Sequence, residues 1–222
     1  EEGKFDLNRL VSDYKDGKYE LDIPIEKMAK FYYDLRTDGR LDDKDISLEE
    51  FQRRLLATKI MKDSTFVYSD IPFIILKDIL PDSDCYFHNY FNEEMNLLDT
   101  SYDISFGNLT GMREGEKVND SKARIMESYG IHPGHAGIFS TSKDLIKLFD
   151  NLNNGFLSNE SIIRMITPAI STPILLNLDG TINLDNGNIK RVNRGMGVYY
   201  KHPEGIRISD IPDVMSDEAF AI

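Results

Sequence analysis

Apolar residues recur at spacings of three and four in the first half of the chain, which is the period of an α-helix. Pro24 opens the first such pattern, and its apolar positions are Ile25, Met28, Phe31, Tyr32 and Leu35. The second begins at a capping box formed by Ser47 and Glu50. Its buried face holds Leu48, Phe51, Leu55 and Leu56, and its polar face includes Lys59.

The stretch 71–80 is almost entirely apolar, with Pro72 in the permitted first turn of a helix. A surface helix would carry more polar residues, so the pattern predicts a central, buried helix. Residues 84–98 are predicted to form another helix. Residues 100–137 show little periodicity and are rich in Gly, Asn and Asp, which predicts a long loop region.

Helical spacing returns after Ser140 and then gives way to strand-like composition. Thr141 and Asp144 resemble a capping box, and Asn154-Gly155 closes the helix that follows. A shorter helix is predicted between Ser158 and Pro168. Beyond it, strand composition appears in three stretches separated by Gly and Asn turns, 174–178, 194–200 and 219–222.

These patterns predict an α/β (α+β) protein with a mostly helical part over residues 1–168 and antiparallel strands over residues 169–222. The 222 residues are enough to bury a sizeable core. Neither end has the character of a natural terminus. We therefore expect the chain to be an interior piece of a longer polypeptide.

Composition excludes several classes of function. The net charge of −12 argues against a nucleic-acid binder, which needs clustered Lys and Arg, and against attachment to anionic lipid. No apolar run approaches the roughly 20 residues of a membrane span. The single cysteine, Cys85, allows no internal disulfide, and its apolar neighbours predict a buried packing thiol.

Two segments carry a family resemblance. Residues 66–76 read Phe-Val-Tyr-Ser-Asp-Ile-Pro-Phe-Ile-Ile-Leu, and residues 134–141 read Gly-His-Ala-Gly-Ile-Phe-Ser-Thr. The first resembles the Tyr-x-Asn motif of class C β-lactamases and related esterases, in a Tyr-Ser-Asp variant. The second resembles a stretch found in exported Gram-positive esterases and penicillin-binding-protein homologues. Weaker matches at 2–7, 95–102 and 118–124 follow in the same order.

The resemblance implies a β-lactamase and transpeptidase-like fold and an acyl-enzyme mechanism. It implies that Tyr68 accepts and returns the nucleophile's proton, and that Asp70 orients a lysine or the substrate. Ser69 and His135 are the expected substrate-binding residues. No cofactor and no metal are expected. The expected substrate is a cell-wall-derived or ester small molecule, and export to the cell envelope is implied by the resemblance alone.

The family's nucleophile motif, Ser-x-x-Lys, has no convincing match in this chain. Residues 12–15 and 140–143 have its spelling, but the first follows the segment it should precede and the second lies where capping residues are needed. The last motif, Lys- or His-x-Gly, is not found either. We therefore expect the parent polypeptide or a companion segment to supply both motifs.

Other interpretations of these residues stay open. Tyr68 could be an aromatic residue beside a buried helix that Ser69 or Asp70 caps, and His135 could organise a Gly-rich loop. The acidic stretch 42–51 resembles the end of a calcium loop but lacks its glycine and oxygen spacing, so a capped helix start is expected. At the level of function, the alternative is a non-catalytic homologue that binds cell-wall polymer or a protein partner.

Overall fold

The structure is a computed structural model, and it describes residues 6–63, 67–81, 83–102 and 120–167 with five short stretches beyond them. Those stretches are 181–182, 184–185, 188–189, 195–200 and 220–221. The chain forms two compact units, and each is described by itself. Unit 1 takes the described residues within 1–38, 56–72 and 158–222, and unit 2 takes those within 39–55 and 73–157.

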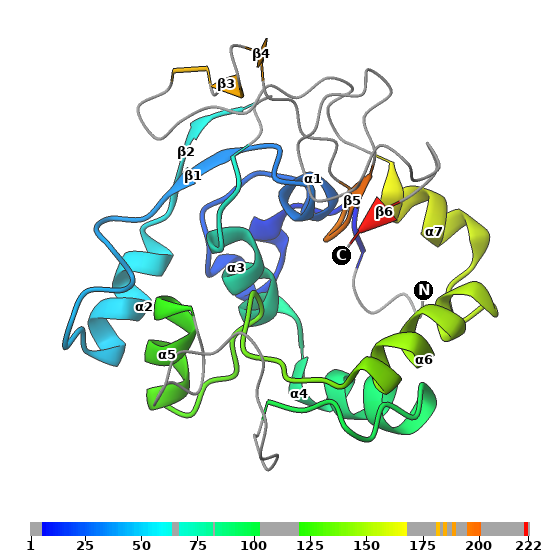
Figure 1. The fold of residues 1–222 in the computed structure, drawn as a ribbon. Coiled ribbons are helices and arrows are strands. Elements are labelled where there is room, and N and C mark those ends of the chain that lie inside the picture. Colours follow the sequence, from blue (N-terminus) through cyan, green and yellow to red (C-terminus); the bar gives the residue numbers. More distant parts are fainter. Residues whose placement is uncertain are drawn as a thin grey trace. The chain divides into compact units, whose positions relative to one another are not determined.

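Unit 1 combines short helices with paired strands (Figure 1). Two 3₁₀ turns, Val11–Asp13 and Lys15–Gly17, precede helix α1, Ile25–Ala29, and helix α7 is Asn159–Ile166. Three antiparallel strand pairs follow the order β1–β2, β3–β4 and β5–β6. Their bounds are Asp34–Arg36 with Lys59–Lys62, Leu184–Asp185 with Asn188–Ile189, and Tyr199–Tyr200 with Phe220–Ala221.

The core of unit 1 forms around α1. Most of its almost fully buried side chains come from the first 35 residues, among them Val11, Tyr19, Leu21, Ile23, Ile25, Met28 and Leu35. A charged cluster joins α7 to α1, because the Arg164 guanidinium donates to the Glu26 carboxylate at 2.6 and 2.8 Å. Lys30, itself buried, donates to the same carboxylate at 2.5 Å.

Unit 2 is helical in the part that the structure describes. Its helices are α2, Leu48–Leu56; α3, Ile71–Ile79; α4, Ser83–Tyr86, continued by a π-helical segment Phe87–Glu94; α5, Ser121–Ser128; and α6, Ser142–Asn153. The last residue of α2 and the first two of α3 belong to unit 1.

The predicted helix starts are confirmed in their hydroxyl halves. The hydroxyls of Ser47, Thr141 and Ser158 each accept a hydrogen bond from the amide three residues later. The carboxylate halves differ, since Glu50 bonds Arg53 and Arg54 while Asp144 turns into the core. The helix predicted to be buried is α3, whose Ile71, Ile74, Ile75 and Ile79 are buried.

The helix predicted at Pro24 is shorter than its apolar pattern. It ends at Ala29, and Phe31 adopts a left-handed backbone with a φ of 57°. A bulky residue rarely adopts that conformation, and it breaks the helix. Leu35 then points into the core from strand β1. The prediction was wrong here because an apolar residue every three or four positions also suits a turn followed by a strand.

Other element predictions need smaller corrections. Lys59 belongs to strand β2 and not to the polar face of a helix, because α2 ends at Leu56. Helix α5 lies within the region predicted as a loop. Cys85 is exposed, so its prediction as a buried thiol was wrong. Strand pairing is confirmed at 199–200 and 220–221, whereas 174–178 lies outside the described residues and the boundary near residue 168 stays a prediction.

Candidate functional site

Tyr68 has an exposed ring and follows a residue whose backbone is hydrogen-bonded within unit 1. Its side chain is 61% exposed. The preceding amide, that of Val67, donates to the Phe31 carbonyl at 3.4 Å, and the rings of Tyr68 and Phe31 lie 5.5 Å apart between centroids. Because Phe31 is buried and Tyr68 is exposed, Phe31 packs near the tyrosine ring from the protein interior and leaves the phenol accessible. A proton-transfer residue needs this accessibility.

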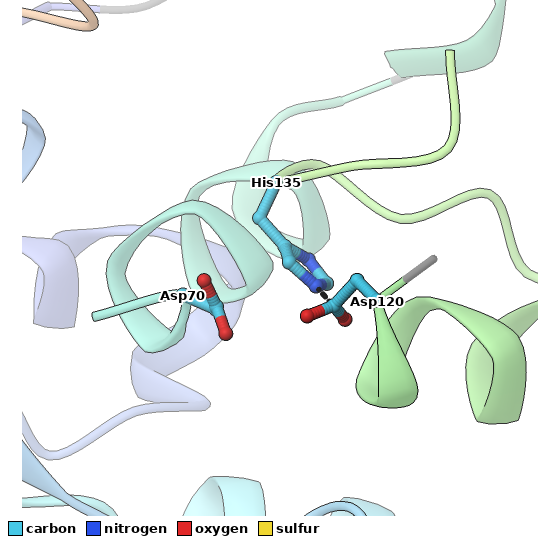
Figure 2. Close-up of side chains that lie close together, drawn as sticks. All are labelled: Asp70, Asp120 and His135. Carbon is cyan, nitrogen blue, oxygen red and sulfur yellow. Dashed lines mark hydrogen bonds and ion pairs between the residues drawn. The ribbon is translucent and has the colours of Figure 1, made fainter. Parts of the chain in front are cut away.

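Ser69 and Asp70 mark the start of helix α3. The Ser69 hydroxyl accepts a hydrogen bond from the Ile71 amide at 3.3 Å, which is a local turn contact. Asp70, labelled in Figure 2, directly precedes the helix, where a carboxylate interacts favourably with the helix dipole. The sequence therefore places Tyr68 three residues before the first residue of α3, and the two residues between them mark the helix start.

His135 and Asp120 form a hydrogen-bonded pair in unit 2 (Figure 2). The His135 Nε2 and Asp120 Oδ1 atoms are 2.9 Å apart, and only 3% of the His135 side chain is exposed. Burial raises the pKa of Asp120. The hydrogen bonds from the Ala123 amide and from His135 outweigh that effect and hold the pKa below its ordinary value. His135, for which a role in organising the Gly-rich loop was left open, bonds through its ring to a carboxylate outside that loop.

The loop that carries His135 packs closely against α3 within unit 2. A Cβ at Gly134 would lie 2.4 Å from the Phe73 carbonyl oxygen and 2.5 Å from the Lys77 Cβ. On the loop's other side, the Tyr102 hydroxyl donates to the Pro133 carbonyl at 3.1 Å. Burial, together with the charges of Asp84 and Glu127, raises the pKa of Tyr102 to about 12, so this phenol stays protonated as a donor.

Gly134→Ala is expected to destabilise the protein by about 1–3 kcal/mol, because the added methyl group overlaps backbone that cannot move aside. The free energy of unfolding in urea measures the effect. Gly130→Asn is the control, since nothing lies within 4 Å of a Cβ there and asparagine tolerates its φ of 71°. Equal stability of the two variants would contradict the close packing of Gly134.

Neither Ser-x-x-Lys spelling has the geometry of a nucleophile motif, in which one helical turn joins the two residues. Ser12 lies in a 3₁₀ turn that ends before Lys15, and its hydroxyl donates to Asp22 at 2.7 Å. Ser140 precedes the N-cap of α6, and its hydroxyl is 2.8 Å from the Thr100 hydroxyl. These contacts agree with the interpretation of both spellings as chance matches.

Asp144 is a buried residue whose role the sequence did not indicate. Its side chain is fully buried, and its Oδ2 accepts from the Asp99 amide at 2.7 Å and the Thr100 hydroxyl at 3.0 Å. The Lys147 ammonium lies 3.1 Å from Oδ1. Asp144 thus joins α6 to the turn at 97–100. Its position at the third residue of a helix suggested a capping carboxylate, and no sequence signal distinguished the two roles.

Solved structures with the same fold were found for this chain. A penicillin-binding protein from Bacillus halodurans matches with a TM-score of 0.59 and 17% identity over 91% of this chain and 65% of its own. FmtA from Staphylococcus aureus matches at 0.51 and 15%, over 90% and 60%. A β-lactamase/D-alanine carboxypeptidase from Yersinia pestis matches at 0.50 and 13%, over 90% and 61%. No family profile and no curated protein matches the sequence.

The chain therefore has the α/β fold of β-lactamases and penicillin-binding proteins, as its motifs predicted. It spans less than two thirds of the length of the three structures compared. Within the described residues, none of the helices has the length and apolar character to cross a membrane.

Proposed function

We propose that this chain belongs to a β-lactamase-related serine hydrolase that acts on the cell envelope. The substrate is an ester or a D-amino-acid amide, the reaction passes through an acyl-enzyme, and the nucleophilic serine lies outside these 222 residues. The fold that the chain shares with a penicillin-binding protein over 91% of its length is the observation that carries the proposal. The exposed Tyr68, which follows the hydrogen-bonded Val67 and lies beside the buried Phe31, supports it.

The proposed chemistry gives Tyr68 one proton to carry. The serine oxygen bonds to the substrate carbonyl carbon as its proton passes to the phenolate oxygen of Tyr68. The bond to the leaving group then breaks, and Tyr68 returns the proton to the departing oxygen or nitrogen. Water, deprotonated in the same way, releases the acid and restores the serine. The envelope location is part of this proposal and follows from the substrate class.

The test is the hydrolysis of a D-alanyl ester by the full-length protein. Steady release of the alcohol, sensitive to a serine-directed fluorophosphonate, is the expected result. Saturable binding without release would instead favour the alternative, a non-catalytic homologue that binds cell-wall polymer or a protein partner. If the protein neither binds nor hydrolyses D-alanyl or acyl esters, the proposed substrate class is overturned.

Asp70→Asn is expected to reduce the preference for substrates that carry an ammonium group. The substitution removes one negative charge while keeping the size of the side chain, so kcat/KM for a D-alanyl ester should fall roughly tenfold relative to its N-acetyl derivative. Asp16→Asn, at an exposed position in a turn of unit 1, is the matched control. An unchanged ratio in the Asp70 variant would eliminate charge recognition by this residue.

A further inference from the structure

One ring nitrogen of His135 has a hydrogen-bond partner, and the other has none among the described residues. Its Nε2 bonds to Asp120 Oδ1 at 2.9 Å, while its Nδ1 is buried and has no hydrogen-bond partner among the residues that the structure describes. Because 97% of the side chain is covered, bulk water does not satisfy this atom. A buried polar atom without a partner is uncommon and marks a place where a ligand or an ordered water binds.

Asp120 determines which nitrogen of His135 carries the proton. The carboxylate is the N-cap of α5, and its Oδ1 also accepts the Ala123 amide at 2.8 Å, so its position is fixed by the helix. Its lowered pKa keeps it ionised, and an ionised carboxylate only accepts hydrogen bonds. The Nε2 atom of His135 must therefore donate. In a neutral imidazole the other nitrogen, Nδ1, is then an acceptor.

The backbone around His135 cannot easily shift to give this acceptor a hydrogen-bond partner within the loop. Gly134 lies against α3 so closely that a methyl group would overlap it, and the Pro133 carbonyl is bonded to Tyr102. The next ring along the loop, His132, stacks on Tyr102 with 4.4 Å between the ring centroids. The loop is thus held at residues 132–134 and the ring is held by Asp120.

We propose that Asp120 is a positioning residue that fixes His135 in the Nε2–H tautomer and presents Nδ1 to a hydrogen-bond donor of the substrate. The donor is a small N–H or O–H group, such as the ammonium of a D-alanyl ester. The identity of the ligand rests on the proposed hydrolase function. The fixed tautomer does not, because it follows from the Asp120 contacts alone.

The tautomer is tested by ¹⁵N NMR of the full-length protein labelled at histidine, at pH 8, with His135→Gln to assign the signals. We expect His135 to show a protonated Nε2 and an unprotonated Nδ1. Asp120→Asn retains both the N-cap and an acceptor oxygen, so the tautomer should persist. Asp120→Ser also caps a helix but is too short to reach the ring, so the two tautomers should mix. A mixture in the wild type, or no change in the serine variant, would overturn the proposal.

The ligand is tested with the methyl esters of D-alanine, D-lactic acid and propionic acid, which differ only in an ammonium, a hydroxyl or a hydrogen at C2. A Tyr68→Phe background prevents turnover during the measurement. The first two esters should move the Nδ1 resonance to lower frequency while the third leaves it in place. Asp120→Ser should weaken their binding about tenfold. Equal shifts from all three esters would overturn the donor-recognition step.

The two proposals fail in different ways. If the full-length protein forms no acyl-enzyme but His135 keeps its tautomer and senses the donor esters, the hydrolase proposal falls and the binding role stands. If acylation proceeds while His135 shows mixed tautomers, the hydrolase proposal stands and the role of Asp120 falls.

Discussion

Tyr68→Phe is expected to lower the acylation rate of the full-length protein roughly 10²–10⁴-fold, which is the usual contribution of a general acid–base residue. The substitution removes the hydroxyl that would carry the proton and keeps the ring that packs near Phe31. Folding should be unaffected because the side chain is mostly exposed. Stopped-flow acylation with a chromogenic ester measures the rate.

Tyr129→Phe is the control for this experiment. It removes the hydroxyl of another exposed tyrosine, and this hydroxyl donates to the Ile46 carbonyl in unit 2. The control should lose some stability and keep its acylation rate. If Tyr68→Phe acylates as fast as the wild type, Tyr68 is only an aromatic residue beside a buried helix, which was the alternative interpretation of its sequence context.

Asp144→Ala is expected to destabilise the protein by roughly 3 kcal/mol, because it leaves the Asp99 amide and the Thr100 hydroxyl without their buried acceptor. It also removes the carboxylate partner of Lys147, which keeps its hydrogen bond to the Asn96 carbonyl. Urea unfolding at pH 7 measures the loss. Asp150→Ala, an exposed carboxylate on the same helix, should change stability far less, and a similar loss in both variants would contradict the buried role of Asp144.

The contribution of Asp144 should also depend on pH. Burial raises the pKa of Asp144. Lys147, the Asp99 amide and Thr100 together lower it by more than burial raises it, so the folded pKa lies below the ordinary value. The stabilisation is therefore fully present above the unfolded pKa of about 3.9 and is lost as the pH falls through the lower folded pKa. The wild type and Asp144→Ala should consequently converge in stability under strongly acidic conditions.

The elements that the sequence predicted well are those with strong local signals. The dry stretch of α3 and the hydroxyl caps at Ser47, Thr141 and Ser158 depend on neighbours within four residues, so a pattern along the chain is enough to find them. The positive φ at Phe31 and the short pairing of β1 with β2 depend on tertiary contacts, and no local pattern announced them.

The candidate site was predicted in part for the same reason. Tyr68 and His135 stood out because their motifs are contiguous. Asp120 lay in a weakly matching segment. Its pairing with His135 could not be predicted, because fifteen residues separate the two and only the fold brings their side chains together. The exposure of single side chains could not be predicted either. The apolar neighbours of Cys85 predicted burial, but Cys85 is exposed at the surface of unit 2.

The most direct test of the proposed hydrolase is the intact mass of the full-length protein before and after treatment with a serine-directed fluorophosphonate. We expect one adduct, located by peptide mapping on a serine outside these 222 residues, and slower formation of that adduct in Tyr68→Phe. A protein that gains no adduct, or gains it on Ser12 or Ser140, would contradict the proposal that this chain works with a nucleophile supplied from elsewhere.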